Sequence, residues 1–183
     1  TNGRGVVSQM VKEAGASARF NGDFFQWTPD PGGDPSGFMV SKGKLLSAEG
    51  RGTRTAAWVW SPGAPGRIIR PKAEVTAVSG LITLHIDTLN GKVAEGGIGL
   101  SFDTAGQVYG HGPMTLVHLD LQGAQPSLTG EIKAKVHSVE SGVTAAPVKK
   151  GFALLAAEDG KAALLTSLTP GSQVEIKITV TGL

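Results

Sequence analysis

The chain has 183 residues, a formal net charge of +2 at pH 7, 40% hydrophobic residues and no cysteine. This length suits one domain with a substantial core, and the missing cysteines exclude a disulfide framework, a thiolate zinc site and a cysteine nucleophile. The mild charge without a basic cluster argues against a nucleic-acid partner, and no apolar run reaches 18 residues, so we expect no membrane span. With 27 glycines, 10 prolines and 5% aromatic residues, the composition favours short strands joined by many turns.

The first predicted element is a helix over residues 6–16. Gly15 is suited to end it, because glycine readily adopts the left-handed conformation that closes a helix. Apolar residues at helical spacing would bury one face of this helix, at Val7, Met10, Val11 and Ala14.

The run Asn-Gly-Asp-Phe-Phe at 21–25 comes next and is the most informative stretch of the chain. The backbone can reverse at Asn21 and Gly22 because both residues tolerate positive φ. The flanking Phe20, Phe24 and Phe25 would anchor the turn in a core. Asp23 is then a carboxylate held in a fixed position; the alternative is an ordinary hairpin with Asp23 in solvent.

Residues 26–37 contain three prolines and three glycines, so we interpret them as a loop beside an active site. Trp27 in this loop offers a ring for contact with a sugar. Asp23, Asp30 and Asp34 could supply oxygen ligands to calcium, but their spacing matches no EF-hand and aspartate beside proline is ordinary turn chemistry. We therefore expect no cofactor, with calcium as the alternative.

The rest of the chain is predicted to be mainly strands. Charged and aliphatic residues alternate over 131–137 and 174–180, which is typical of half-exposed antiparallel strands. A short second helix is predicted over 160–168. The candidate strands cover residues 55–60, 67–70, 74–78, 81–88, 98–102, 114–121, 129–139, 151–156 and 173–180.

In their order along the chain, several of these pieces resemble the phosphodiester glycosidase family, relatives of the enzyme that removes N-acetylglucosamine from a phosphodiester on mannose. The resemblance implies an α+β fold: a large, mostly antiparallel β-sheet with one N-terminal helix and a second short helix. It also implies a hydrolase that cleaves a sugar-1-phosphodiester bond in a phosphate-containing glycan, in a secreted or cell-envelope setting. The matching pieces are residues 6–16, 21–25, 37–44, 147–156 and 168–172.

The chain also departs from the pattern of this family. Family members end with an Asp-Gly-Gly-Gly-Ser loop that contributes to the active site, and this sequence has no such run. They also have strands before the first helix. We therefore expect residues 1–183 to be a single, incomplete domain, completed by a second chain or by a further segment.

The resemblance and the residue chemistry together suggest roles for the site residues. Asp23 would be the catalytic acid or nucleophile, Asn21 would orient substrate hydroxyls, and Gly22 would contribute to substrate binding. A phosphodiester leaving group needs charge stabilisation more than a proton, and Arg51 or Arg54 could supply it. Surface solvation is the alternative for both arginines.

Two further patterns bear on function. His85 with Asp87, and His118 with Asp120, each place two polar residues on one strand face, where four ligands could gather around a metal or simply face solvent. His111 lies between two glycines and could act as a general acid. The rival function is a non-catalytic, β-rich envelope module that binds glycan or protein.

Overall fold

The computed structural model describes residues 12–13, 15, 38–41, 44–49, 57–59, 65–127 and 129–182. The strands are β1 (Met39–Ser41), β2 (Lys44–Glu49), β3 (Ala57–Val59), β4 (Arg67–Ile69), β5 (Lys72–Ser79), β6 (Ile82–His85), β7 (Thr88–Leu89), β8 (Ile98–Phe102), β9 (Gln107–Asp120), β10 (Gly130–Pro147), β11 (Phe152–Glu158) and β12 (Gln173–Thr181). The helical elements are the 3-10 turns η1 (Asp103–Ala105) and η2 (Asp159–Lys161) and the α-helix α2 (Ala162–Thr166).

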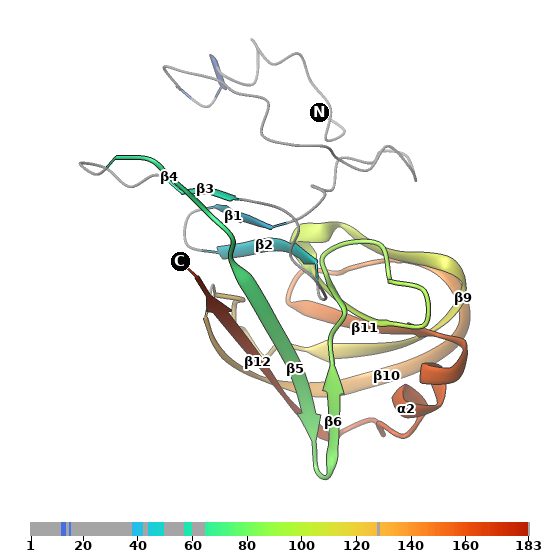
Figure 1. Cartoon of the computed structure of the whole chain (residues 1–183). Helices are drawn as coiled ribbons and strands as arrows, with labels where there is room; N and C mark the ends of the chain where they lie inside the picture. The colour runs from blue at the N-terminus through green and yellow to red at the C-terminus, as the bar shows by residue number, and fades with distance from the viewer. Residues whose placement is uncertain are drawn as a thin grey trace.

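Ten of these strands form one sheet in the order β1-β2-β7-β8-β11-β9-β10-β12-β5-β6, and β3 and β4 form a separate pair. Neighbouring strands are antiparallel except β7 and β8, which are parallel. The sheet is strongly curved (Figure 1). It closes on itself at the connection between β6 and β7, where Ile86 N–H donates to Val75 O at 3.0 Å and Asp87 N–H donates to Ile98 O at 2.7 Å.

The main core lies inside this curved sheet. Buried side chains from β5, β6, β8, β9, β10, β11 and β12 form one cluster, and α2 adds Leu165 to it. The alternation predicted over 131–137 is confirmed in β10, and that predicted over 174–180 is confirmed in β12 as far as residue 178, because exposed and buried residues alternate there. The aliphatic face of each strand therefore packs inward and its charged face points outward.

A second, smaller core lies on the other side of β9 and β11. Its buried residues include Met114, Leu116 and Leu154. The long strand β10 bends at three irregularities in its pairing with β9, and one of them lies at Gly142, whose φ is +81°. Because of this bending, Val143 and Ala146 of β10 pack against the second core.

The predicted fold class is wrong. The described chain is mostly β-sheet; its α-helical residues are those of the short α2, together with Lys12 and Glu13. No N-terminal helix is among the described elements, and of the expected helix over 6–16 only Lys12, Glu13 and Gly15 are described. The sheet covers its own apolar face by curving, so the core needs little helix to close it.

Most strand predictions are confirmed. The candidate 98–102 coincides with β8, and the candidates 151–156 and 173–180 match β11 and β12 to within two residues at each end. The predicted second helix is present as α2, and Gly171 follows it with a φ of +91°.

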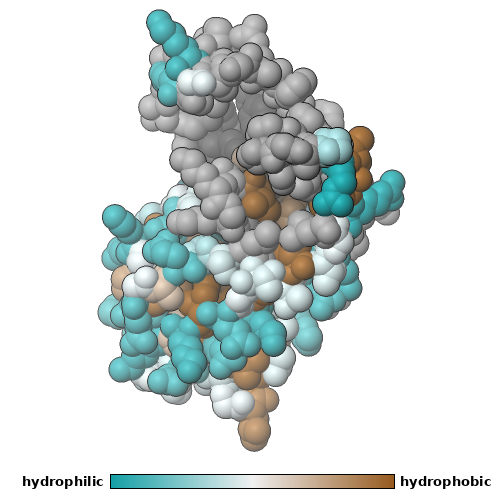
Figure 2. All heavy atoms as spheres, turned by 90° about the vertical axis from the view of Figure 1, so that its left-hand side faces the viewer, coloured by the Kyte–Doolittle hydropathy of each residue, from teal (hydrophilic) through white to brown (hydrophobic). Residues whose placement is uncertain are grey.

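The outer surface of the described sheet is largely polar. Hydrophilic side chains cover much of the described face that Figure 2 shows. The apolar projection at its foot is the tip of the β5–β6 hairpin, where Leu81 is fully exposed. Within the described ranges, no helix is long and apolar enough to cross a membrane.

Candidate functional site

The residues predicted to form the active site lie outside the part of the chain that the structure describes. Asp30 and Asp34, the other two possible calcium ligands, also lie outside the described residues, as do the anchoring phenylalanines Phe20, Phe24 and Phe25. The six site predictions therefore stay predictions: Asn21, Gly22, Asp23, Trp27, Arg51 and Arg54.

The described chain shows where the segment that carries the motif joins the sheet. Phe38 packs against the main core, and β1 and β2 then form an antiparallel pair at one edge of the sheet. Ala48 of β2 is 5% exposed and lies opposite Leu89 of β7. Residue 37, the last of the predicted loop, is thus followed by Phe38 and β1, which pairs with β2, and β2 pairs in turn with β7.

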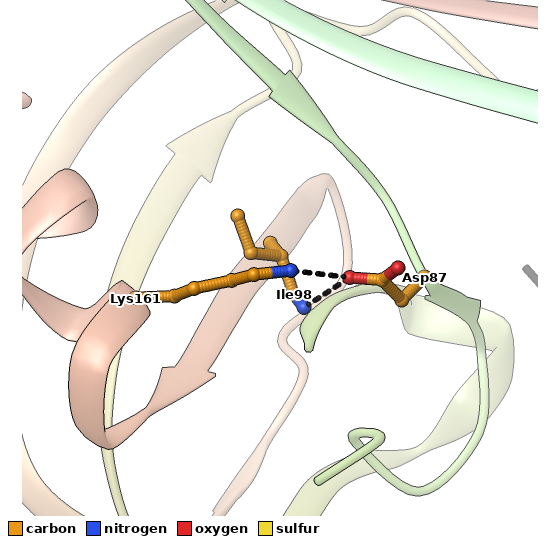
Figure 3. A network of polar contacts seen from close by, with 3 residues as sticks. All are labelled: Asp87, Ile98 and Lys161. Atoms are coloured by element: carbon orange, nitrogen blue, oxygen red, sulfur yellow. Dashed lines mark hydrogen bonds and ion pairs between the residues drawn. The ribbon is translucent and has the colours of Figure 1, made fainter. Parts of the chain in front are cut away.

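The two-residue connection between β6 and β7 contains a buried carboxylate. Asp87 is 9% exposed, and its Oδ2 accepts hydrogen bonds from Ile98 N–H at 2.9 Å and from Lys161 Nζ at 3.0 Å (Figure 3). Lys161 belongs to η2, so this contact joins the closure of the sheet to the corner after β11. The amide and the ammonium offset the desolvation of the carboxylate, which otherwise costs several kcal/mol.

Asn90 fixes the turn after β7. Its φ is +52°, a conformation that asparagine tolerates better than most residues, and it is 2% exposed. Its Oδ1 accepts a hydrogen bond from Phe102 N–H at 2.6 Å, and its Nδ2 donates to Thr104 Oγ1 at 3.1 Å. The dipeptide Asn90-Gly91 is a turn signal that could have revealed this role from the sequence.

A second buried carboxylate lies at the end of β11. Glu158 is 4% exposed, and its Oε1 accepts hydrogen bonds from the backbone N–H groups of His111 and Gly112, the latter at 3.1 Å. These amides belong to residues 110–113, which lie between the paired residues Tyr109 and Met114 of β9 and have no partner in the ladder with β10. Glu158 thus satisfies amides that the sheet leaves unpaired.

Gly110 makes this contact possible. A Cβ added at Gly110 would collide with Oε1 of Glu158 and would lie 2.8 Å from Met114 Sδ. His111 itself is exposed, so its imidazole faces solvent, while its backbone N–H donates to the buried Glu158. No local pattern in the sequence pointed to Glu158, because its partners are 46 and 47 residues away.

The possible metal site formed by the two His-x-Asp pairs is not present. Among the described residues, no group of three or more histidine, cysteine, aspartate or glutamate side chains could hold a metal ion. His85 lies on β6, and His118 and Asp120 lie on β9, which is not a neighbour of β6 in the sheet. Asp87, in the β6–β7 connection, forms an ion pair with Lys161. His118 instead lies with Nε2 3.4 Å from Glu140 Oε1.

Comparison with known proteins establishes the fold and nothing beyond it. No family model and no curated protein matches the chain. A hypothetical protein from Synechocystis is similar in structure, with a TM-score of 0.69 and 15% identity over 94% of this chain and 30% of that one. A presumed exported protein from Burkholderia pseudomallei K96243 also has a TM-score of 0.69, with 17% identity over 96% of this chain and 40% of that one. The chain therefore spans between 30% and 40% of the length of these two neighbours.

Proposed function

We propose that the chain is the scaffold and part of the active site of a hydrolase that cleaves sugar-1-phosphodiester bonds. The observation that carries this proposal is the run Asn-Gly-Asp-Phe-Phe at 21–25, which resembles the signature of the phosphodiester glycosidases. The substrate is a glycan in which a phosphodiester is attached to the anomeric carbon of a sugar. The setting is the cell envelope or the exterior, in keeping with the presumed export of one structural neighbour.

The proposed reaction breaks the bond between the anomeric carbon and the phosphodiester oxygen. Water adds to that carbon, directly or through a glycosyl intermediate on Asp23, and the electron pair of the broken bond leaves with the phosphate. The products are a free sugar and a phosphomonoester. Arg51 or Arg54 would stabilise the charge on the phosphate, and Asn21 would hold the sugar hydroxyls.

The described scaffold supports this proposal indirectly. The segment after the motif pairs through β2 with β7, and β7 and β8 are fixed by the buried contacts of Asp87 and Asn90. Site residues on a loop keep their geometry only when the elements that flank the loop are rigid. The sheet edge with which β2 pairs is held in this way by buried hydrogen bonds.

Release of free sugar from a synthetic sugar-1-phosphodiester tests the proposal. The Asp23→Asn variant should lose turnover while its melting temperature stays unchanged, because the change removes a charge and keeps the shape. Glu175→Gln is the matched control, since Glu175 is an exposed carboxylate on β12. Near wild-type turnover by Asp23→Asn would exclude Asp23 as nucleophile or base.

A non-catalytic envelope module that binds glycan or protein is the second candidate. Its support is the missing Asp-Gly-Gly-Gly-Ser run together with the small share of the neighbours' length that this chain covers. Binding of the phosphodiester without any release of sugar, by this chain and by the longer protein if one contains it, would favour this candidate.

A further inference from the structure

Four exposed or half-exposed side chains form a row across the outer face of the sheet, from β12 to β11. Gln173 of β12 lies opposite Lys135 of β10, Lys135 lies opposite Asp120 of β9, and Asp120 lies opposite Phe152 of β11. Directly opposite residues of antiparallel strands share a face, so these four residues, which we call the outer row, point to the same side. Three strand spacings give the row a length of about 14 Å.

Phe152 is the unusual member of the outer row. Its side chain is only partly buried, and it belongs to neither the main core nor the second core. Its described ring contact is with His137 of β10, at 5.5 Å between centroids and an angle of 80°. Exposure of a phenyl ring to water is unfavourable, and Phe152 packs into neither core. Core packing therefore does not explain a phenylalanine at this position.

The polar side chains of the outer row make few hydrogen bonds or ion pairs with the described chain. Asp120 accepts one hydrogen bond, from Gln122 N–H at 2.9 Å on Oδ1. Lys135 takes part in none of the ion pairs among the described residues, whereas Lys177 on the same outer face lies 3.4 Å from its cross-strand partner Glu131. Beside the row, Nε2 of His118 is buried, makes no hydrogen bond within the described chain and lies 3.4 Å from Glu140 Oε1.

We propose that the outer row is a binding strip for a neutral pyranose oligosaccharide. The electron-rich face of Phe152 suits the polarised C–H groups of a sugar ring, while the amide, ammonium and carboxylate can bind its hydroxyls as donors and acceptors. One lysine and one aspartate leave the row without net charge, which favours a neutral ligand over a polyanion.

The same surface suits a protein partner less well. The large hydrophobic residues that the described chain exposes lie on β1, β4, β5, α2 and the β5–β6 turn, and none is on β9, β10 or β11. Protein interfaces need an apolar centre, and the outer row has a single ring. The proposal uses none of the residues of the proposed catalytic motif and does not depend on the proposed hydrolase activity.

Amide NMR titration of the chain with maltotetraose, cellotetraose and chitotetraose tests the proposal. At least one of these should give saturable shifts at the four residues of the row and at His137. The Phe152→Leu variant, which keeps an apolar side chain but removes the ring, should weaken that binding at least tenfold. Asp120→Asn, which keeps the oxygen that accepts Gln122 N–H, should weaken it several-fold.

Lys177→Ala is the matched control, because Lys177 is an exposed lysine on the same face but outside the row. This variant should bind the oligosaccharide with the affinity of the wild type. Melting temperatures confirm that each variant is folded, which we expect for Phe152→Leu because the ring belongs to no core. The proposal is overturned if none of the three oligosaccharides shifts the row, if Phe152→Leu binds as well as the wild type, or if the anionic polymer polygalacturonate binds the row more tightly than the neutral sugars.

Discussion

Two corners of the molecule each bury a carboxylate, and they satisfy it in different ways. At the β6–β7 connection, Asp87 is held by one backbone amide and by the ammonium of Lys161. At the end of β11, Glu158 is held by two backbone amides of the 110–113 segment, and none of the ion pairs in the described chain involves it. Only two residues separate Glu158 from Lys161 in the sequence, so both corners depend on one short segment.

The difference between the two corners shows what each can tolerate. The cation that faces Asp87 is about one-third exposed, so solvent can partly replace it when it is lost. The amides that face Glu158 are fixed in a segment without ladder partners, so nothing else among the described residues satisfies them. We therefore expect the Glu158 corner to be the more sensitive one.

The largest effect is expected for Glu158→Ala. Loss of the carboxylate leaves the amides of His111 and Gly112 without acceptors and opens a small cavity, and we expect a destabilisation of about 3–4 kcal/mol. Urea unfolding measures it. Glu158→Gln keeps an acceptor oxygen and should cost about half as much; equal stability of the two variants and the wild type would mean that these hydrogen bonds contribute nothing.

Gly110→Ala should come next. The new Cβ would collide with Oε1 of Glu158, so the contact must open, at about 2 kcal/mol. Gly112→Ala is the matched control because a Cβ there meets nothing within 4 Å, and we expect it to cost less than about 1 kcal/mol. A reversed order in thermal unfolding would argue against a rigid contact between Glu158 and the 110–113 segment.

Lys161→Met should have a smaller effect. The change removes the ammonium that faces the buried carboxylate of Asp87, and partial exposure of the lysine reduces the expected destabilisation to about 1–2 kcal/mol. Lys177→Met, on an exposed ion pair, should stay within about 0.5 kcal/mol of the wild type. If both lysine variants unfold at the wild-type urea concentration, the Asp87 contact is dispensable.

The smallest effect concerns an exposed carboxylate. A hydrogen bond from Lys72 at 2.7 Å, together with the charge of that lysine, holds the pKa of Glu74 below its usual value. A lowered pKa in the folded state means that this pair stabilises the protein above the ordinary pKa of glutamate, and that the contribution is lost as the pH falls. NMR titration should show the pKa of Glu74 rising toward its usual value in Lys72→Met.

The strands were predictable because their signals are local. β8 is an apolar run bounded by glycine and aspartate, and β10 and β12 alternate charged and aliphatic residues. β9 and β10 extend further than predicted because Gly110, Pro113 and Gly142 indicate turns locally, whereas the structure accommodates them as irregularities within long strands. The fold class was wrong because the curvature that lets one sheet enclose its own core arises from long-range pairing.

The buried polar contacts were harder to predict than the strands. Asp87 stood out in the sequence as a possible metal ligand, and its actual partner is 74 residues away. No sequence pattern indicated a role for Glu158, because its partners are backbone amides of a glycine-containing segment far away in the sequence. The proposed catalytic residues rest on a local motif at 21–25, so the sequence alone supports them.

One assay that compares three carboxylates tests the central claim most directly. Release of sugar from a sugar-1-phosphodiester is measured per folded molecule for Asp23→Asn, Asp87→Asn and Glu158→Gln, together with each melting temperature. We predict that Asp23→Asn abolishes turnover at an unchanged melting temperature, while the other two lower the melting temperature and keep the turnover of the molecules that remain folded. Loss of turnover in Asp87→Asn or Glu158→Gln at an unchanged melting temperature, with Asp23→Asn active, would contradict the account and place the reactive carboxylate in the sheet.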